Sequence, residues 1–198
     1  ALGAKRDGTF VAAGISMWYE AGAYRGSPSG AGAMCVLAPY KVPNFLIEAF
    51  DVVVNKPKVA AYRAPGSPMA AFAIESAVDE IARQLKLDPI EVRLKNAVSD
   101  ADPAPFGPPF GPIGLKTLLE TVQRHPHMKA PLGANQGRGF GCGFWFNAGM
   151  NSSATITLGA DGSAAVMTGN PDIGGTRVAQ ALMVAEELRI PVEQVRPS

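Results

Sequence analysis

The chain has 198 residues, 47% of them hydrophobic and 18% charged, with a formal net charge of +1 at pH 7. This apolar content suffices for the core of one large domain or two small ones, and so small a net charge leaves no basic face for a run of phosphates. We therefore expect a globular protein that binds no nucleic acid, and no stretch approaches the ~20 apolar residues that a membrane span needs.

The first third of the chain predicts strands separated by a long loop. Residues 9–19 combine β-branched, aromatic and small residues after a turn, which is typical of a strand leaving a hairpin. Residues 21–39 are rich in glycine, serine, proline and alanine and predict a loop. Residues 45–54 alternate in a strand-like way, and a second extended run is expected at residues 59–62.

The strongest helical pattern follows a turn that contains Arg63. From Pro68 to Leu85, apolar residues recur at three- and four-residue spacing with charged residues between them. Pro68 suits the first helical position and Ser67 suits the N-cap. A shorter helix is expected directly afterwards, in DPIEVRLKNAV, with Asp88 as its N-cap.

The second half begins with a proline-rich segment. Residues 100–112 contain five prolines and predict irregular structure, and a short helix is expected at residues 114–124. Residues 137–146, GRGFGCGFWF, alternate glycine with large residues, which is typical of a strand approached closely by another backbone or by a ligand. A hairpin is expected within residues 154–168, and an amphipathic helix at residues 176–188.

These elements predict an α+β fold with mixed β-sheets and packed helices. We expect three parts: residues 1–99, a Pro/Gly-rich linker with a short helix at residues 100–136, and residues 137–198. A strand, then a glycine-containing turn with an arginine, then a helix occurs in the first part and again in the last. Such a turn presents free N–H groups and the positive end of a helix dipole, which suits an anion. It is also a common structural element, so both interpretations stay open.

No familiar nucleotide or metal motif accompanies these turns. The chain lacks GxxxxGK[ST], and its GxGxG-like stretch is not followed by a helical pattern. Its two cysteines, Cys35 and Cys142, have no CxxC spacing, which argues against a structural zinc site and against a disulfide framework. His125 and His127 flank a proline in the linker and are expected to be neither base nor ligand.

A longer pattern resembles a known family. Residues 61–98, AYRAPGSPMAAFAIESAVDEIARQLKLDPIEVRLKNAV, resemble the molybdenum-binding subunit of the xanthine dehydrogenase and aldehyde oxidase family, which reads A-[FY]-R-[GA]-x-G-x-P, DE-[LIV]-A and LDP-x-E-[VL]-R-x-KN. Upstream AGAY and YKVPN, and downstream DGSAAVMTGNPDIGGTRVAQALMVAEEL, continue the resemblance over essentially the whole chain. It implies a fragment of a larger subunit, with parts of two molybdopterin-binding subdomains.

The resemblance implies roles for individual residues. Arg63 would lie beside the molybdenum centre, within a wall formed by Tyr62, Ala64, Pro65 and Gly66. The turn that touches the pterin cofactor would be Gly174, Gly175, Thr176 and Arg177. Phe144 would stack on the substrate, with Trp145 beside it. Molybdenum would be held through the pterin and not by a protein side chain.

Two departures from the family pattern restrict the class of substrate that we expect. Where the family has Gly-Gln-Gly, this chain has Gly174-Gly175-Thr176, so a glutamine contact is missing. Where xanthine-oxidising members have a second stacking phenylalanine, this chain has Pro65, and their purine-binding arginine would fall near Ala31. A purine is therefore not the expected substrate.

The implied reaction is hydroxylation of a carbon in an aldehyde or N-heterocycle, with oxygen from water and a glutamate as general base. That glutamate is expected beyond Ser198, so the fragment alone should be inactive. The implied cofactor is molybdopterin with molybdenum, in the cytosine dinucleotide form. The implied partners are the rest of the large subunit, iron–sulfur and flavin (FAD) subunits or domains, and a small-molecule substrate. The expected location is the cytoplasm, with the periplasm open.

Simpler interpretations stay open at the same residues. Arg63 could be a surface charge, Arg177 an exposed cation, and Phe144 and Trp145 core side chains. At the level of the whole protein, one alternative is a non-catalytic scaffold or interaction domain derived from this fold. Another is a carbon monoxide dehydrogenase-like enzyme.

Overall fold

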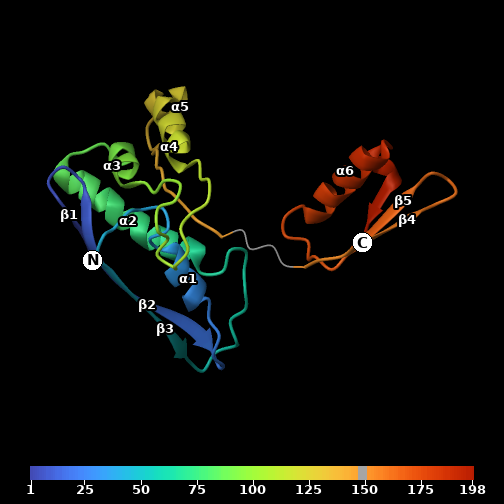
Figure 1. The fold of residues 1–198 in the computed structure, drawn as a ribbon, viewed down its shortest axis with the longest axis horizontal. Helices are drawn as coiled ribbons and strands as arrows, with labels where there is room; N and C mark the ends of the chain where they lie inside the picture. Colours follow the sequence, from blue (N-terminus) through green and yellow to red (C-terminus); the bar gives the residue numbers. More distant parts are fainter. Residues whose placement is uncertain (147–150) are drawn as a thin grey trace. The chain divides into compact units, whose positions relative to one another are not determined.

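The structure is a computed structural model that describes residues 1–146 and 151–198 (Figure 1). The first compact unit is Ala1–Phe146, and residues 151–198 belong to the second. Each unit combines helices with a three-stranded sheet of mixed direction. The predicted α+β fold is therefore confirmed. Among the helices that are described, none has both the length and the apolar character that crossing a bilayer requires.

The sheet of the first unit has the order β1–β2–β3. The short β1 (Leu2–Ala4) runs antiparallel to β2 (Phe10–Gly22), which confirms the predicted hairpin. The pairing of β2 with β3 (Phe45–Val53) is parallel and places Trp18 opposite Phe50. A parallel pair needs a crossover connection, and here the crossover contains a helix.

That helix, α1 (Ser29–Cys35), corrects the prediction of a loop at residues 21–39. It lies between α2 and the β2–β3 pair (Figure 1). Its glycines concealed the helical pattern, because glycine is a poor helix former. Position 32 requires glycine because it has no room for a side chain: a Cβ there would overlap the hydroxyl of Tyr19.

The second extended run expected at residues 59–62 is not a strand. Its one backbone hydrogen bond to the sheet joins the N–H of Val59 to the carbonyl of Ala21, at 3.1 Å. Residues 59–61 therefore offer no strand on which the next helix could pack. Helix α2 (Ser67–Leu85) instead packs on β1, α1 and α3, and its inner face contributes Ile74 and Val78 to the core around Phe10.

Helix α2 begins one residue earlier than its predicted start. Gly66 is the N-cap, with a φ of 84°, and Ser67 is already helical. The hydroxyl of Ser67 does not cap the helix, because it donates to the carbonyl oxygen of Phe144 at 2.6 Å. Helix α3 (Pro89–Asn96) follows, and Asp88 caps it as predicted by accepting from the N–H groups of its first turn.

The proline-rich segment is irregular, as predicted, and is followed by α4 (Leu115–Arg124) and α5 (Pro126–Lys129). Leu119 of α4 is completely buried against Ala97 and Cys142. Residues 100–136, expected as a linker, are thus held on the first unit. The limits of the two cofactor-binding subdomains stay a prediction.

No strand forms at residues 137–146, so that prediction is wrong. The physical reason is that backbone groups of this segment bond to side chains of α2 and not to a neighbouring strand. The N–H of Cys142 donates to Glu75, and the carbonyl of Phe144 accepts from Ser67.

The second unit contains the predicted hairpin and helix at the predicted limits. β4 (Ala154–Leu158) pairs antiparallel with β5 (Ala164–Thr168), which pairs parallel with β6 (Val195–Pro197). Helix α6 (Thr176–Leu188) connects to β6 through the 3₁₀ helix η1 (Val192–Gln194). Its inner face is buried with Ala164, Val166 and Val195.

Candidate functional site

The turn before α2 contains two residues in the left-handed region of the backbone. Ala64 has a φ of 54° and Gly66 a φ of 84°, and the N–H of Ser67 closes the turn on the carbonyl of Ala64 at 3.0 Å. Alanine rarely adopts a positive φ, which costs on the order of 1–3 kcal/mol, and such residues cluster at functional sites. Ala101 and three other non-glycine residues among those described share this conformation, so the backbone of the turn is consistent with a functional loop but does not identify one by itself.

Gly66 fixes this turn to the rest of the first unit. A Cβ at this position would overlap the carbonyl oxygen of Pro28 and would lie 2.8 Å from the N–H of Gly32. The hydroxyl of Tyr19 donates to the carbonyl of Gly66 at 3.2 Å. Contacts with both α1 and β2 therefore determine where the preceding residues lie.

Arg63 and Tyr62 project from this anchored turn toward solvent. Tyr62 is 88% exposed, and Arg63 has neither a hydrogen bond nor an ion pair with any other described residue. A guanidinium that is free of protein partners is available to an anionic or polar ligand. Pro65 is half-buried beside it and offers no aromatic ring.

Phe144 and Trp145 lie close to the start of α2, because the hydroxyl of Ser67 holds the Phe144 carbonyl. The Phe144 ring packs against Phe106 at 5.7 Å and Phe110 at 5.8 Å, measured between ring centroids. The cavity beside it measures 120 Å³, which is below the ~300 Å³ at which ligand pockets begin. Trp145 is 42% exposed and stacks on Phe146.

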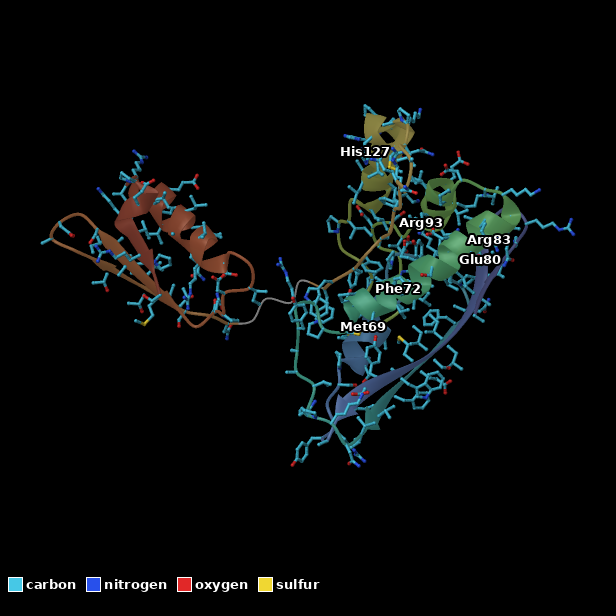
Figure 2. All side chains as sticks on the ribbon, turned by 180° about the vertical axis from the view of Figure 1, so that it is seen from behind. Met69, Phe72, Glu80, Arg83, Arg93 and His127 are labelled. Atoms are coloured by element: carbon cyan, nitrogen blue, oxygen red, sulfur yellow. The ribbon has the colours of Figure 1, made fainter. Side chains whose placement is uncertain are left out.

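The structure thus brings two predicted site segments together. Ser67 comes directly after Gly66, and its partner Phe144 is 77 positions away in the sequence. A larger cavity, of 510 Å³, opens close by between the end of β2, residues 59–60 and the first turn of α2. Figure 2 labels Met69, one of its lining residues, at the start of that helix.

A buried charge cluster behind this site was missed in the sequence. Arg93, labelled in Figure 2, is completely buried. Its Nε lies 2.8 Å from Oε2 of Glu75, and its Nη2 lies 2.8 Å from Oδ1 of Asp79. Burial alone would lower the pKa of Arg93, but the charges of Glu75 and Tyr40 and the hydrogen bonds to Glu75 and Asp79 together more than offset this and raise the pKa overall. Glu75 also accepts from the Tyr40 hydroxyl and from the N–H of Cys142.

One sequence signal could have identified this cluster. Glu75 precedes the buried Val78 by three residues and the buried Ala82 by seven, so it belongs to the inner face of α2. Glu80 and Arg83 lie on the exposed side and pair with each other at 2.6 Å (Figure 2). Position relative to the apolar residues of α2, and not charge, distinguishes the buried Glu75 from the exposed Glu80 and Arg83.

The turn before α6 belongs to the second unit and has a related geometry. Gly174 and Gly175 have φ values of 67° and 97°, and no side chain caps the helix. Thr176 closes the turn by accepting from the N–H of Ile173 at 3.2 Å, and Arg177 is exposed without a partner among the described residues.

These residues fit an anionic cofactor. The first N–H groups of an uncapped helix carry the positive end of its dipole and bind anions readily. The positive charge of Arg177 lies at the positive end of the helix dipole, which is unfavourable, and a bound anion would offset this repulsion. Within residues 1–146 and 151–198, no group of three or more His, Cys, Asp and Glu side chains is arranged to hold a metal ion.

Comparisons with known proteins agree with this chemistry. Residues 1–97 and 118–198 match two family models, each described as a molybdopterin cofactor-binding domain. The chain is 29% identical over 213 residues to the xanthine dehydrogenase molybdenum-binding subunit of Escherichia coli, which covers 98% of the chain and 28% of that protein. It is 31% identical over 189 residues to the aldehyde oxidoreductase of Megalodesulfovibrio gigas, which covers 86% of the chain and 20% of that protein.

Solved structures show the same fold. The aldehyde oxidoreductase from Desulfovibrio gigas superimposes with a TM-score of 0.72 at 24% identity, covering 100% of this chain and 24% of that one. Quinoline 2-oxidoreductase from Pseudomonas putida superimposes with a TM-score of 0.67 at 23% identity, and the match covers 100% of this chain and 29% of that one. The chain therefore spans less than a third of the length of these proteins.

Proposed function

This chain belongs to the family of molybdopterin cofactor-binding domains that occur in the molybdenum-binding subunits of xanthine dehydrogenases and aldehyde oxidoreductases, and from that premise we propose that it contributes cofactor binding and an active-site wall to a molybdenum hydroxylase. The substrate is an aldehyde or an N-heterocycle other than a purine. The inserted oxygen comes from water.

The observation that carries the proposal is the meeting of the Arg63 turn with the Phe144 segment through Ser67. One segment supplies a free cation on an anchored turn, and the other supplies aromatic side chains beside it. A fixed positive charge stabilises negative charge that develops during a reaction, and it needs no reorganisation at that moment. Arg63 is the residue of this chain that acts on the reacting centre.

The second unit holds the cofactor. Gly174 and Gly175 let the backbone approach the ligand closely, and the uncapped N–H groups at Thr176 and Arg177 bind its anionic part. When bound, the molybdenum cofactor supplies the two-electron oxidation of the substrate. We propose the cytosine dinucleotide form of the cofactor, with iron–sulfur and FAD centres on partner subunits or domains and the general base in the rest of the large subunit.

The substrate class is inferred from relatives and from one residue. The proteins to which the chain is similar include ones named for aldehydes, for quinoline, which is an N-heterocycle, and for xanthine, which is a purine. Pro65 has no ring to complete an aromatic sandwich around a purine. No observation on the described residues or in the comparisons favours a non-catalytic scaffold. A location in the cytoplasm stays a prediction.

The test is oxidation by the complete subunit, purified with its partners, of a panel of aromatic aldehydes, N-heterocycles and purines in isotopically labelled water. We expect the label in the product from an aldehyde or N-heterocycle and the slowest turnover with purines. Molybdenum and pterin are measured in the same preparation. A fully loaded enzyme whose product carries no label would contradict the proposal.

A further inference from the structure

We propose that Glu75 is a positioning residue that holds the Phe144–Trp145 segment at a set place beside the Arg63 turn. The inference rests on the proposed function, which gives these two segments their roles. It adds a residue that touches neither substrate nor cofactor and acts through the backbone of residues 142–144.

The segment that carries Phe144 and Trp145 has little to hold it in place by itself. It reads GRGFGCGFWF, it forms no strand, and glycines flank Cys142 on both sides. A Cβ at Gly143 would meet no atom within 4 Å, so close packing does not restrict the residue on that side. Glycine-rich backbone has more conformational freedom to lose than any other. Packing of the Phe144 ring on Phe106 and Phe110 holds the side chain, and specific hydrogen bonds are needed to hold the glycine-rich backbone.

Two such bonds come from α2. Oε2 of Glu75 accepts the N–H of Cys142 at 2.7 Å, and the hydroxyl of Ser67 donates to the carbonyl of Phe144 at 2.6 Å. The two bonds bracket Gly143, so they fix the backbone on both sides of the flexible position. Because Ser67 directly follows Gly66, the same helix fixes the Arg63 turn and the aromatic segment relative to each other.

The Glu75 carboxylate is itself locked in orientation. Arg93, completely buried, donates from Nε to the same Oε2 at 2.8 Å, and the Tyr40 hydroxyl donates to Oε1. The Arg93 guanidinium also lies 5.8 Å from the centroid of the Phe140 ring, two residues before Cys142. A carboxylate held by three donors is a rigid acceptor, and a backbone N–H bonded to it gains a charge-assisted hydrogen bond.

The experiment uses the complete subunit with its partners and compares Glu75→Gln, Glu75→Leu and Ser67→Ala with the wild type. Glutamine keeps an acceptor for the N–H of Cys142, whereas leucine removes it. The matched control is Glu80→Gln, on the exposed face of the same helix. Ser67→Ala removes the second bond with the smallest change in volume. Glu75→Gln keeps the volume of Glu75, so it tests the proposal even where Glu75→Leu does not fold.

The first measurement is amide hydrogen exchange. In Glu75→Leu and Ser67→Ala, peptides that contain residues 140–146 should exchange about tenfold faster, which corresponds to the loss of one ordinary hydrogen bond. Peptides of β2 and α6 should not change. The Glu75→Gln variant should lie between Glu75→Leu and the wild type, and Glu80→Gln should match the wild type. Unchanged exchange at residues 140–146 in Glu75→Leu, or in Glu75→Gln where Glu75→Leu does not fold, would overturn the proposal.

The second measurement separates positioning from mere stability. In Glu75→Leu, the KM for a bulky aromatic aldehyde should rise about tenfold. The kcat of the same variant for a small aliphatic aldehyde, and its molybdenum content, should stay at wild-type values. The Gln variant should recover part of the discrimination. Equal changes for both aldehydes would overturn the positioning role. A loaded wild-type enzyme that oxidises neither substrate class would refute the proposed function, whereas hydrogen exchange would still report whether Glu75 fixes the segment.

Discussion

Replacing Arg93 with methionine removes the most deeply buried charge of the described chain. Arg93 is 0% exposed and pairs with Glu75 and Asp79. The side chain of Asp79 is 56% exposed, so solvent screens this pair and it contributes little. Glu75 is buried, and loss of its cationic partner typically costs ~3–5 kcal/mol. Because Glu75 keeps the Tyr40 and Cys142 donors, we expect the lower end, about 3 kcal/mol.

A double-mutant cycle shows whether this loss comes from the pair. Glu75→Gln combined with Arg93→Met removes both charges and keeps an acceptor for Cys142. We expect the double variant to be about 2 kcal/mol more stable than the sum of the single changes predicts. The control, Arg83→Met, removes an exposed cation of α2 and should change stability by no more than ~0.5 kcal/mol.

The free energy of unfolding of each variant is measured by urea denaturation under identical conditions, with circular dichroism as the signal. The reasoning would be refuted if Arg93→Met and Arg83→Met destabilised the protein equally. It would also be refuted if the double variant showed no coupling, because the buried pair would then contribute nothing beyond its separate parts.

Three further outcomes are expected. Arg63→Met in the complete enzyme should lower kcat by ~10²–10³ with unchanged folding, and a decrease of less than about threefold in steady-state turnover would show that the charge has no catalytic role. Gly66→Ala should cost about 2–4 kcal/mol in thermal unfolding, because a Cβ collides with the Pro28 carbonyl and the φ is unfavourable; wild-type stability would show that the turn can shift. The Lys41 ion pair lowers the pKa of Asp102, so this carboxylate stabilises the fold above its ordinary pKa of about 3.9, and the stability is lost as pH falls through the lowered value. Asp102→Asn should flatten that acid limb, and an unchanged pH profile would contradict the assignment.

Elements whose apolar residues recur at a regular helical or strand spacing could be predicted from the sequence almost to the residue. Helix α6 and β5 have the expected limits because each has one buried face. Strand β4 is exposed along its whole length, and its limits follow from the turn at residues 159–162 that pairs it with β5. Helix α1 could not be predicted, because its small residues serve close approach to Tyr19 and leave no apolar stripe. Residues 137–146 have a strand-like pattern, but their backbone bonds to side chains of α2.

The candidate site shows the same division. The Arg63 turn was identified from local residues and from a family resemblance, and its proposed role stays a prediction. Its contact with Phe144 depends on one hydrogen bond across 77 positions, which no local pattern encodes. The charges of Glu75 and Arg93 resembled those of a solvated helix face, because their burial depends on elements that pack against α2.

The pairing of β3 has a consequence for handling this chain by itself. Among the described residues, β3 pairs with β2 alone, so one side of a nine-residue strand offers unpaired N–H and C=O groups. Apolar Leu46 and Phe50 are exposed along it. Open strand edges of this kind template intermolecular pairing and aggregation. When the chain is produced in isolation, we expect self-association through β3, and a lysine at Leu46 should suppress it.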